Sequence, residues 1–214
     1  MAAPGMLTEG RAVGAAGPKG EAIAAAALRL FLRDGYERTS VDAIAAEARV
    51  SKRTVYNRYG DKENLFLSVL RDTYNSMMTT FRAIVDKHLG DVTDVQQDLT
   101  AFALEVAFTI TTAPDRIALV RLIMSEAPFF PALITAEQGP TTMHGSIAAY
   151  LARLAGEGRL AISDPAEAAG HLVALTINRI NARTMFGVVP VSDPEVERII
   201  TSGVAVFVRA YRPA

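Results

Sequence analysis

The chain has no cysteine and no tryptophan among its 214 residues. Without cysteine there is no disulfide framework, no thiolate nucleophile and no Cys-ligated zinc. No apolar run approaches the roughly 20 residues that a membrane-spanning helix requires. The N-terminus also lacks the basic-then-apolar pattern of a signal peptide. We therefore expect a cytoplasmic protein that does not enter a membrane.

Catalytic motifs are lacking as well. The three histidines, His88, His144 and His171, lie far apart and show neither H-E-x-x-H nor His-x-His spacing. No nucleophile elbow, P-loop or dinucleotide fingerprint is found in the sequence. We expect no enzyme activity, no cofactor and no metal. An enzyme in the second half of the chain, built from residues distant in sequence, stays open as an alternative.

Charge is present but unevenly distributed. The formal net charge is −1, so the total does not indicate a polyanionic partner. The stretch Lys19–Lys62, however, holds nine cations and six acids, a local balance of +3 that leaves −4 elsewhere. A cationic segment on an acidic remainder would orient the protein on a polyanion.

Two short helices around a tight turn are predicted within this cationic stretch. The first begins at Thr39, a hydroxyl N-cap, with Asp42 in the place of a capping-box acid. Ser51 is the N-cap of the second. This arrangement is a helix-turn-helix, whose second helix typically lies in the DNA major groove. The predicted core of the motif is Val41, Ile44, Ala45, Val50, Val55 and Tyr59.

The second helix carries the side chains that nucleic acid requires. Its first turn, Lys52 to Thr54, is the part that reaches base edges when such a helix docks. The next turn, Tyr56 to Arg58, offers a phenol, an amide and a guanidinium to phosphates or bases. Asp61 is the predicted cap of a third helix, and Lys62 with the free amides there forms a phosphate site. A helical adaptor that docks on an acidic protein is the alternative.

The stretch Arg29–Leu70 closely resembles the DNA-binding domain of TetR-family transcriptional regulators. The resemblance rests on G-Y-x-x-T-S from Gly35 and on V-S-K-x-T-x-Y-x-x-Y-x-x-K-E from Val50. The family usually has glycine in the interhelix turn where this chain has Arg49. We therefore expect a reshaped turn or a strain of roughly 1 kcal/mol. The expected DNA contacts are Thr39, Ser40, Ser51, Lys52, Arg53, Thr54, Tyr56, Asn57, Arg58 and Lys62.

Helical periodicity continues to the end of the chain, and we see no competing strand pattern. The expected fold is all-α: a three-helix DNA-binding head with a helix-turn-helix, and a larger helical body for ligand binding and dimerisation. The expected domains are a disordered arm over 1–18, the head over 19–62 and the body over 63–214. Expected helices cover 19–34, 61–90, 92–112, 114–126, a short segment 131–138, a helix ending near 155, then 164–186 and 193–211.

The resemblance implies a cavity for a small hydrophobic effector among the body helices. Methionine and phenylalanine side chains are plentiful there, and ligand pockets are mostly apolar with a few placed polar groups. The same side chains at helical spacing also suit an ordinary core, which stays the alternative for each. The candidate lining residues are Phe81, Phe102, Arg121, Met124, Glu126, His144, Asn178 and Asn181.

By the same resemblance the last two helices pair with their copies in a homodimer. Gly203, in the middle of the final apolar stripe, would permit close approach of a partner helix. The alternative, that both stripes face their own core, stays open. The predicted function is a ligand-responsive transcriptional regulator that binds a palindromic operator in double-stranded DNA. Most members of the family are repressors, and an activator of the same fold is the alternative.

Overall fold

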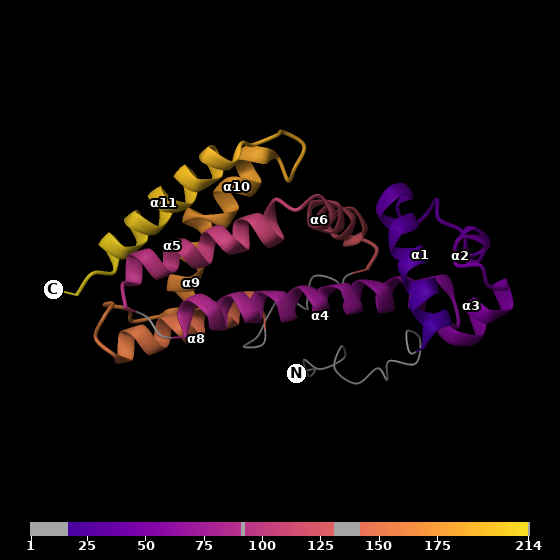
Figure 1. The fold of residues 1–214 in the computed structure, drawn as a ribbon, viewed down its shortest axis with the longest axis horizontal. Helices are drawn as coiled ribbons and strands as arrows, with labels where there is room; N and C mark the ends of the chain where they lie inside the picture. Colours follow the sequence, from indigo (N-terminus) through magenta and orange to yellow (C-terminus); the bar gives the residue numbers. More distant parts are fainter. Residues whose placement is uncertain (1–16, 91–92, 131–141, 214) are drawn as a thin grey trace. The chain divides into compact units, whose positions relative to one another are not determined.

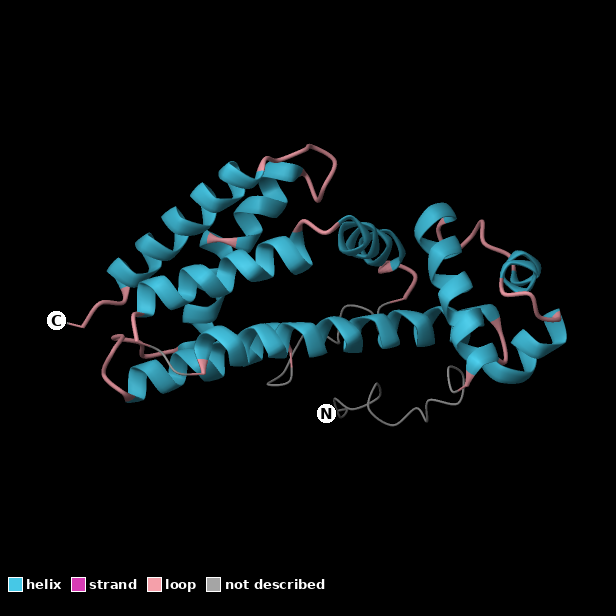
Figure 2. Cartoon of the chain, in the orientation of Figure 1, coloured by secondary structure: helices cyan, strands magenta, loops and turns pink. Residues whose placement is uncertain are grey.

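The computed structural model describes residues 17–90, 93–130 and 142–213, and the regular structure in these residues is helical (Figure 2). The all-α expectation is confirmed. Most of the expected arm 1–18 and the expected segment 131–138 lie outside the described residues. No described helix has the length and hydropathy to cross a membrane. The helices are α1 (Pro18–Asp34), α2 (Val41–Glu47), α3 (Lys52–Tyr59), α4 (Lys62–Leu89), α5 (Val95–Val106), η1 (Ala107–Thr111), α6 (Pro114–Glu126), α8 (Met143–Gly156), α9 (Pro165–Leu175), α10 (Ile177–Thr184) and α11 (Asp193–Ala210) (Figure 1).

These helices form two compact units. The head unit holds the described residues up to Ser76 together with Met124–Phe129. The body unit holds Met77–Ile123 and the described residues from Phe130 onward. The boundaries between the units therefore fall inside α4 and near the end of α6. The expected division of the chain after residue 62 stays a prediction.

The core of the head unit is built by one apolar face from each of α1 to α4. The rings of Phe31, Tyr36 and Phe66 cluster, with Phe66 centred 4.9 Å from each of the other two. Tyr59 is buried and donates its phenol hydrogen to the Gly20 carbonyl at 3.4 Å, which ties α3 to α1. The predicted core of the motif is confirmed except at Val50, which is half-buried. The fully buried large residues here are Ile23, Phe31, Ile44, Leu65 and Phe66.

The first helix of the motif begins later than the sequence suggested. Ser40, not Thr39, is the N-cap of α2, and its hydroxyl accepts a hydrogen bond from the Ala43 amide at 3.1 Å. The Thr39 hydroxyl instead turns inward and donates to the carbonyl oxygens of Gly35 at 2.8 Å and Leu30 at 3.3 Å. Asp42 consequently stands outside the capping-box position. Adjacent hydroxyls can both cap a helix, and here burial of Thr39 decides between them.

The body unit is a helical bundle in which α9 packs against α8, α10 and α11, and α11 packs also against α5. Phe81 of α4 and Phe102 of α5 meet edge to face in its core, with ring centroids 5.8 Å apart. At the end of α4, Lys87 and His88 both bond one oxygen of Glu105, at 2.6 and 2.5 Å. These bonds lower the pKa of the Glu105 carboxyl.

The helix expected over 164–186 is broken into two. It begins as predicted, with Asp164 accepting hydrogen bonds from the amides of Ala166 and Glu167. The chain then leaves helical geometry at Thr176, where φ is −119° and ψ is −88°. The Thr176 hydroxyl donates to the Leu172 carbonyl at 2.6 Å, a back-bonding pattern that bends helices.

Gly203 of α11 lies against this break. A Cβ atom at Gly203 would stand 2.1 Å from the Leu175 carbonyl oxygen, so only glycine fits. The close approach expected from Gly203 therefore exists, and the neighbouring helix belongs to the same chain. The apolar stripe of α11 is likewise buried within the body unit: Val196, Ile199, Ile200, Val204 and Phe207.

The turn between α10 and α11 has an unusual backbone. Met185 and Phe186 have φ of 48° and 53°, and Gly187 follows at 80°. A left-handed conformation costs non-glycine residues roughly 1–2 kcal/mol each. Met185 and Val188 point outward, exposed by 63% and 60%. The turn thus presents apolar side chains on a strained backbone.

Candidate nucleic-acid interface

The helix α3 is fixed at both ends and along one face. At its start the Ser51 hydroxyl accepts from the Thr54 amide at 3.1 Å and bonds the Thr54 hydroxyl at 2.8 Å. At its end Gly60 adopts φ of 82° and closes the helix onto the Tyr56 carbonyl. Val55 and Tyr59 are buried on the inner face. The opposite face is therefore held outward on a rigid support.

That outward face carries the side chains expected to contact DNA. Arg53, Tyr56 and Asn57 are exposed, and Tyr56 is 42% exposed although it is aromatic. Within the described residues, no hydrogen bond or ion pair engages these three side chains. Thr54 and Arg58 flank them and are half-buried. A guanidinium, an amide and a phenol are thus available to base edges and phosphates.

Lys52, also expected among the contacts, is already paired. Its ammonium lies 2.8 Å from a carboxylate oxygen of Asp42 on α2. This hydrogen bond raises the pKa of Lys52. Both side chains are exposed, so the pair adds little to stability. This pairing could not be predicted from the sequence, because the two residues are ten positions apart on different helices.

Two other expected contacts have structural partners. Thr39 is only 2% exposed, and its hydroxyl is used inside the turn between α1 and α2. This corrects the expectation for Thr39, because a buried hydroxyl is not presented to a phosphate. Lys62 is half-buried and donates to the Tyr36 carbonyl at 2.9 Å. Its phosphate contact stays a prediction, and so do those of Ser40 and Ser51, which are exposed N-caps.

The interhelix turn keeps the shape that usually requires glycine. Arg49 has φ of 54°, in the left-handed region, and its side chain is exposed. Of the two outcomes expected from the sequence, the turn is strained and not reshaped. The exposed side chain of Arg49 adds one more cation just before α3.

Two family models match the chain. Residues 23–69 match "Bacterial regulatory proteins, tetR family", which covers the helix-turn-helix just described. Residues 97–213 match "AefR-like transcriptional repressor, C-terminal domain", more than half of the chain. The chain belongs to the TetR family. This family consists of DNA-binding transcriptional regulators and not of enzymes, as the sequence led us to expect.

Three known regulators are similar to this chain in sequence or in structure. The DNA-binding transcriptional repressor TetR of Mycobacteroides abscessus is 45% identical over 49 residues, which are 23% of this chain and 26% of that protein. The chain therefore matches about a quarter of the length of that curated relative. A TetR-family regulator from Mesorhizobium loti is similar over 95% of this chain and all of its own, with 27% identity and a TM-score of 0.82. The flavonoid-responsive regulator FrrA covers 92% of this chain and 99% of its own, with 28% identity and a TM-score of 0.67.

The candidate effector residues are divided between the two units. Phe81 and Phe102 meet in the body core, whereas Met124 and Glu126 belong to the head unit. The structure therefore does not gather the set in one compact unit, and its role stays a prediction. In the body unit, Arg121 and Asn178 are exposed, Asn181 is half-buried, and His144 bonds the Ala166 carbonyl at 3.0 Å.

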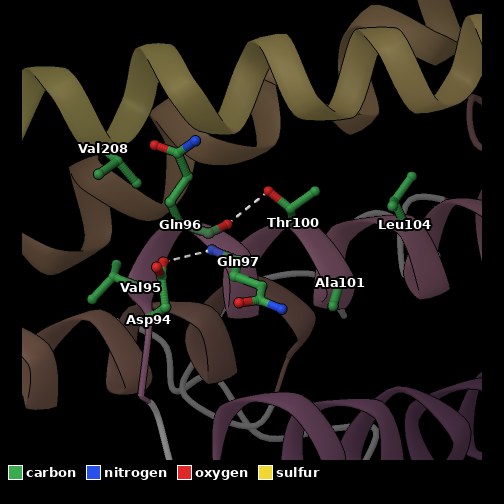
Figure 3. A pocket seen from close by; sticks show the side chains of 8 residues that line it. All are labelled: Asp94, Val95, Gln96, Gln97, Thr100, Ala101, Leu104 and Val208. Carbon is green, nitrogen blue, oxygen red and sulfur yellow. Dashed lines mark hydrogen bonds between the residues drawn. The ribbon is translucent and has the colours of Figure 1, made fainter.

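Two features of the body unit were missed from the sequence. Tyr150 of α8 is 5% exposed, and its hydroxyl has no hydrogen-bond partner among the described residues. Burial raises the pKa of this phenol. The second feature is an open groove of about 740 Å³ beside α5 (Figure 3). Its lining residues are Asp94, Val95, Gln96, Gln97, Thr100, Ala101, Leu104 and Val208.

Proposed function

We propose that this protein is a dimeric transcriptional repressor of the bacterial cytoplasm, which binds a palindromic DNA operator and is released by a small hydrophobic effector. The observation that carries the proposal is the exposed face of α3, where Arg53, Tyr56 and Asn57 stand outward on a capped helix. The match to an AefR-like repressor domain supports the repressor role.

Dimerisation is proposed because one recognition helix reads too little sequence. A two-fold dimer presents two such helices about 34–36 Å apart, one turn of DNA. The last helices, α9–α10 and α11, are the proposed interface, although the stripe of α11 is buried in its own core. Val206 of α11 is exposed, and the turn between α10 and α11 exposes Met185, Phe186 and Val188.

The effector is proposed to enter the body unit near the Phe81–Phe102 pair. Tyr150 supplies a buried hydroxyl that a ligand could satisfy, and buried polar groups are rarely left without a partner. FrrA is, by its name, responsive to flavonoids, which are aromatic molecules that commonly carry hydroxyl groups. Release of DNA requires that the effector bind the DNA-free conformation more tightly than the bound one.

The test is a selection of duplexes from random sequence by the purified full chain. We expect enrichment of a palindrome, with a two-fold dimer bound to it. Arg53→Ala should then weaken binding to the selected operator more than binding to random DNA, since a base contact is lost. No enrichment, or a stable monomer on DNA, would reject the proposal, and equal losses on both DNAs would reject base reading by Arg53.

The effector is tested separately with the flavonoid naringenin as the probe. We expect it to raise the melting temperature and to release the operator, and Tyr150→Phe to weaken both effects. Tyr211→Phe, which removes another hydroxyl of the body unit, is the control. Binding of naringenin that leaves DNA affinity unchanged would contradict the release mechanism.

A further inference from the structure

Glu126 is a buried acid in an unexpected place. It is the last residue of α6 and belongs to the head unit, and it is only 9% exposed. Glutamate is almost never buried without a partner. The partner here is the backbone amide of Tyr36, which donates to Glu126 Oε1 at 3.3 Å. A carboxylate from position 126 therefore completes a turn at position 36.

The turn that it completes joins α1 to α2. Gly35 ends α1 with φ of 80°, and the Thr39 hydroxyl bonds the Gly35 carbonyl. The Tyr36 peptide groups are held from two sides, since the amide donates to Glu126 and the carbonyl accepts from Lys62. Lys62 also lies over the Tyr36 ring, 4.2 Å from its centroid. Side chains from α4 and α6 thus hold the turn between α1 and α2.

Glu126 is the last residue of α6, a helix whose residues are divided between the two units. The helix begins at Pro114 in the body unit, and its last turn, from Met124, is part of the head unit. The Tyr36–Glu126 hydrogen bond measures 3.3 Å, just beyond the usual 2.7–3.2 Å range of N–H···O bonds. A small withdrawal of the last turn of α6 would leave the Tyr36 amide without an acceptor.

We propose that Glu126 is a positioning residue for DNA binding, which acts as a hydrogen-bond acceptor for Tyr36 and not as a charge. This inference rests on the proposed function, because it concerns how the head binds its operator. With the acceptor in place, the α1–α2 turn is fixed, and α2 supports α3 in the orientation that reads DNA. Without it, the head spends part of its time in arrangements that do not bind.

The experiment separates the acceptor from the charge with two conservative variants of the full chain. Glu126→Gln keeps an oxygen at the same distance and loses the charge. Glu126→Asp keeps the charge and draws the oxygen back by one methylene group. The readouts are hydrogen exchange at the Tyr36 amide, the melting temperature and affinity for the selected operator. Glu37→Gln and Glu37→Asp, at an exposed acid of the same turn, are the matched controls.

We expect Glu126→Asp to speed exchange at Tyr36 about tenfold, since the amide loses its acceptor. The same variant should lower operator affinity about fivefold by reducing the population that is competent to bind. Glu126→Gln should leave both readouts within about twofold of the wild type. If the Glu126 charge acted only by long-range repulsion of DNA, Glu126→Gln would bind more tightly than the wild type. If the turn instead required the charge itself, Glu126→Gln would bind more weakly than Glu126→Asp.

Three results would overturn the inference. The first is a reversed order, with Glu126→Gln weaker than Glu126→Asp, which would assign the role to charge. The second is loss of affinity in parallel with melting temperature in both variants, which would show a general effect on folding. The third is unchanged exchange at Tyr36 in Glu126→Asp. Failure of the wild type to select an operator would instead reject the proposed function itself.

Discussion

Single residues of the helix-turn-helix depart from what its pattern alone suggests, and Arg49 is one. Its φ of 54° is a conformation in which glycine or asparagine is comfortable and arginine is not. The strain persists because α2 and α3 are fixed on either side by their own caps. The residue therefore couples a cost in stability to a gain in positive charge beside α3.

We predict that Arg49→Gly raises the free energy of unfolding by about 0.5–1 kcal/mol, as the left-handed strain is removed. Arg49→Ala is the control, because alanine loses the cation and keeps the strain. Chemical denaturation of the three proteins measures the difference. Equal stability of the glycine and alanine variants would contradict the strain argument. Both variants should bind DNA more weakly through loss of one cation.

The Lys52–Asp42 pair leads to a second prediction at this scale. Under the proposed function, Asp42 competes with DNA for the ammonium of Lys52, with which it is paired, and adds a negative charge beside α3. Asp42→Asn should therefore raise DNA affinity about three- to tenfold at low salt, and less at high salt because of screening. Glu47→Gln, at the other end of α2, removes an equal charge and is the control. Fluorescence anisotropy at two salt concentrations measures both, and a weaker Asp42→Asn protein would refute the competition.

At the scale of elements, the junction of α9, α10 and α11 decides how the body unit packs. The sequence predicted one helix over 164–186, since its periodicity is continuous. The structure has a break at Thr176, into which α11 fits at Gly203. The contact joins residues almost thirty positions apart. Local pattern does not contain such information: it predicted a close approach at Gly203 but assigned the neighbouring helix to a second subunit, whereas the neighbour is Leu175 of the same chain.

We predict that Gly203→Ala lowers the free energy of unfolding by about 3 kcal/mol, because overpacking against backbone is costly to relieve. Its Cβ would stand 2.1 Å from the Leu175 carbonyl oxygen. Gly156→Ala is the matched control: it lies in α8, and nothing stands within 4 Å of its added Cβ. That variant should be unchanged or slightly more stable. Thermal or chemical denaturation compares them, and equal stability of both would show that α11 can shift freely.

At the scale of the whole molecule, DNA binding should be governed by the release of counterions. About eight phosphate contacts per dimer give a slope near −7 in a plot of log affinity against log salt concentration. The net charge of −1 would not suggest such dependence, but the excess of cations is concentrated between Lys19 and Lys62. Titration of the selected operator from low to high salt measures the slope. A flat titration would mean that α3 does not meet phosphates.

The proposed dimerisation is also a property of the whole molecule. Val206 is 47% exposed on α11, and it is one of the few apolar side chains left uncovered there. Val206→Glu should shift the monomer–dimer equilibrium toward monomer at least about tenfold, since it places like charges across a two-fold axis. Analytical ultracentrifugation checks this. Thr201→Glu, at an exposed position on a different side of the same helix, shows whether the effect is confined to the face of Val206. An unchanged dimer would place the interface elsewhere.

The sequence by itself determined the helical fold, the capped helix-turn-helix and the outward side chains of α3. These depend on residues within a few positions of one another: Ser51 with Thr54, or Asp61 with Asn64. The tertiary structure alone decided that Thr39 is buried, that Lys52 meets Asp42, and that Glu126 completes the turn at Tyr36. The physical reason is distance along the chain. Hydrogen bonds and ion pairs between remote segments depend on how whole helices pack, and no local pattern records that packing.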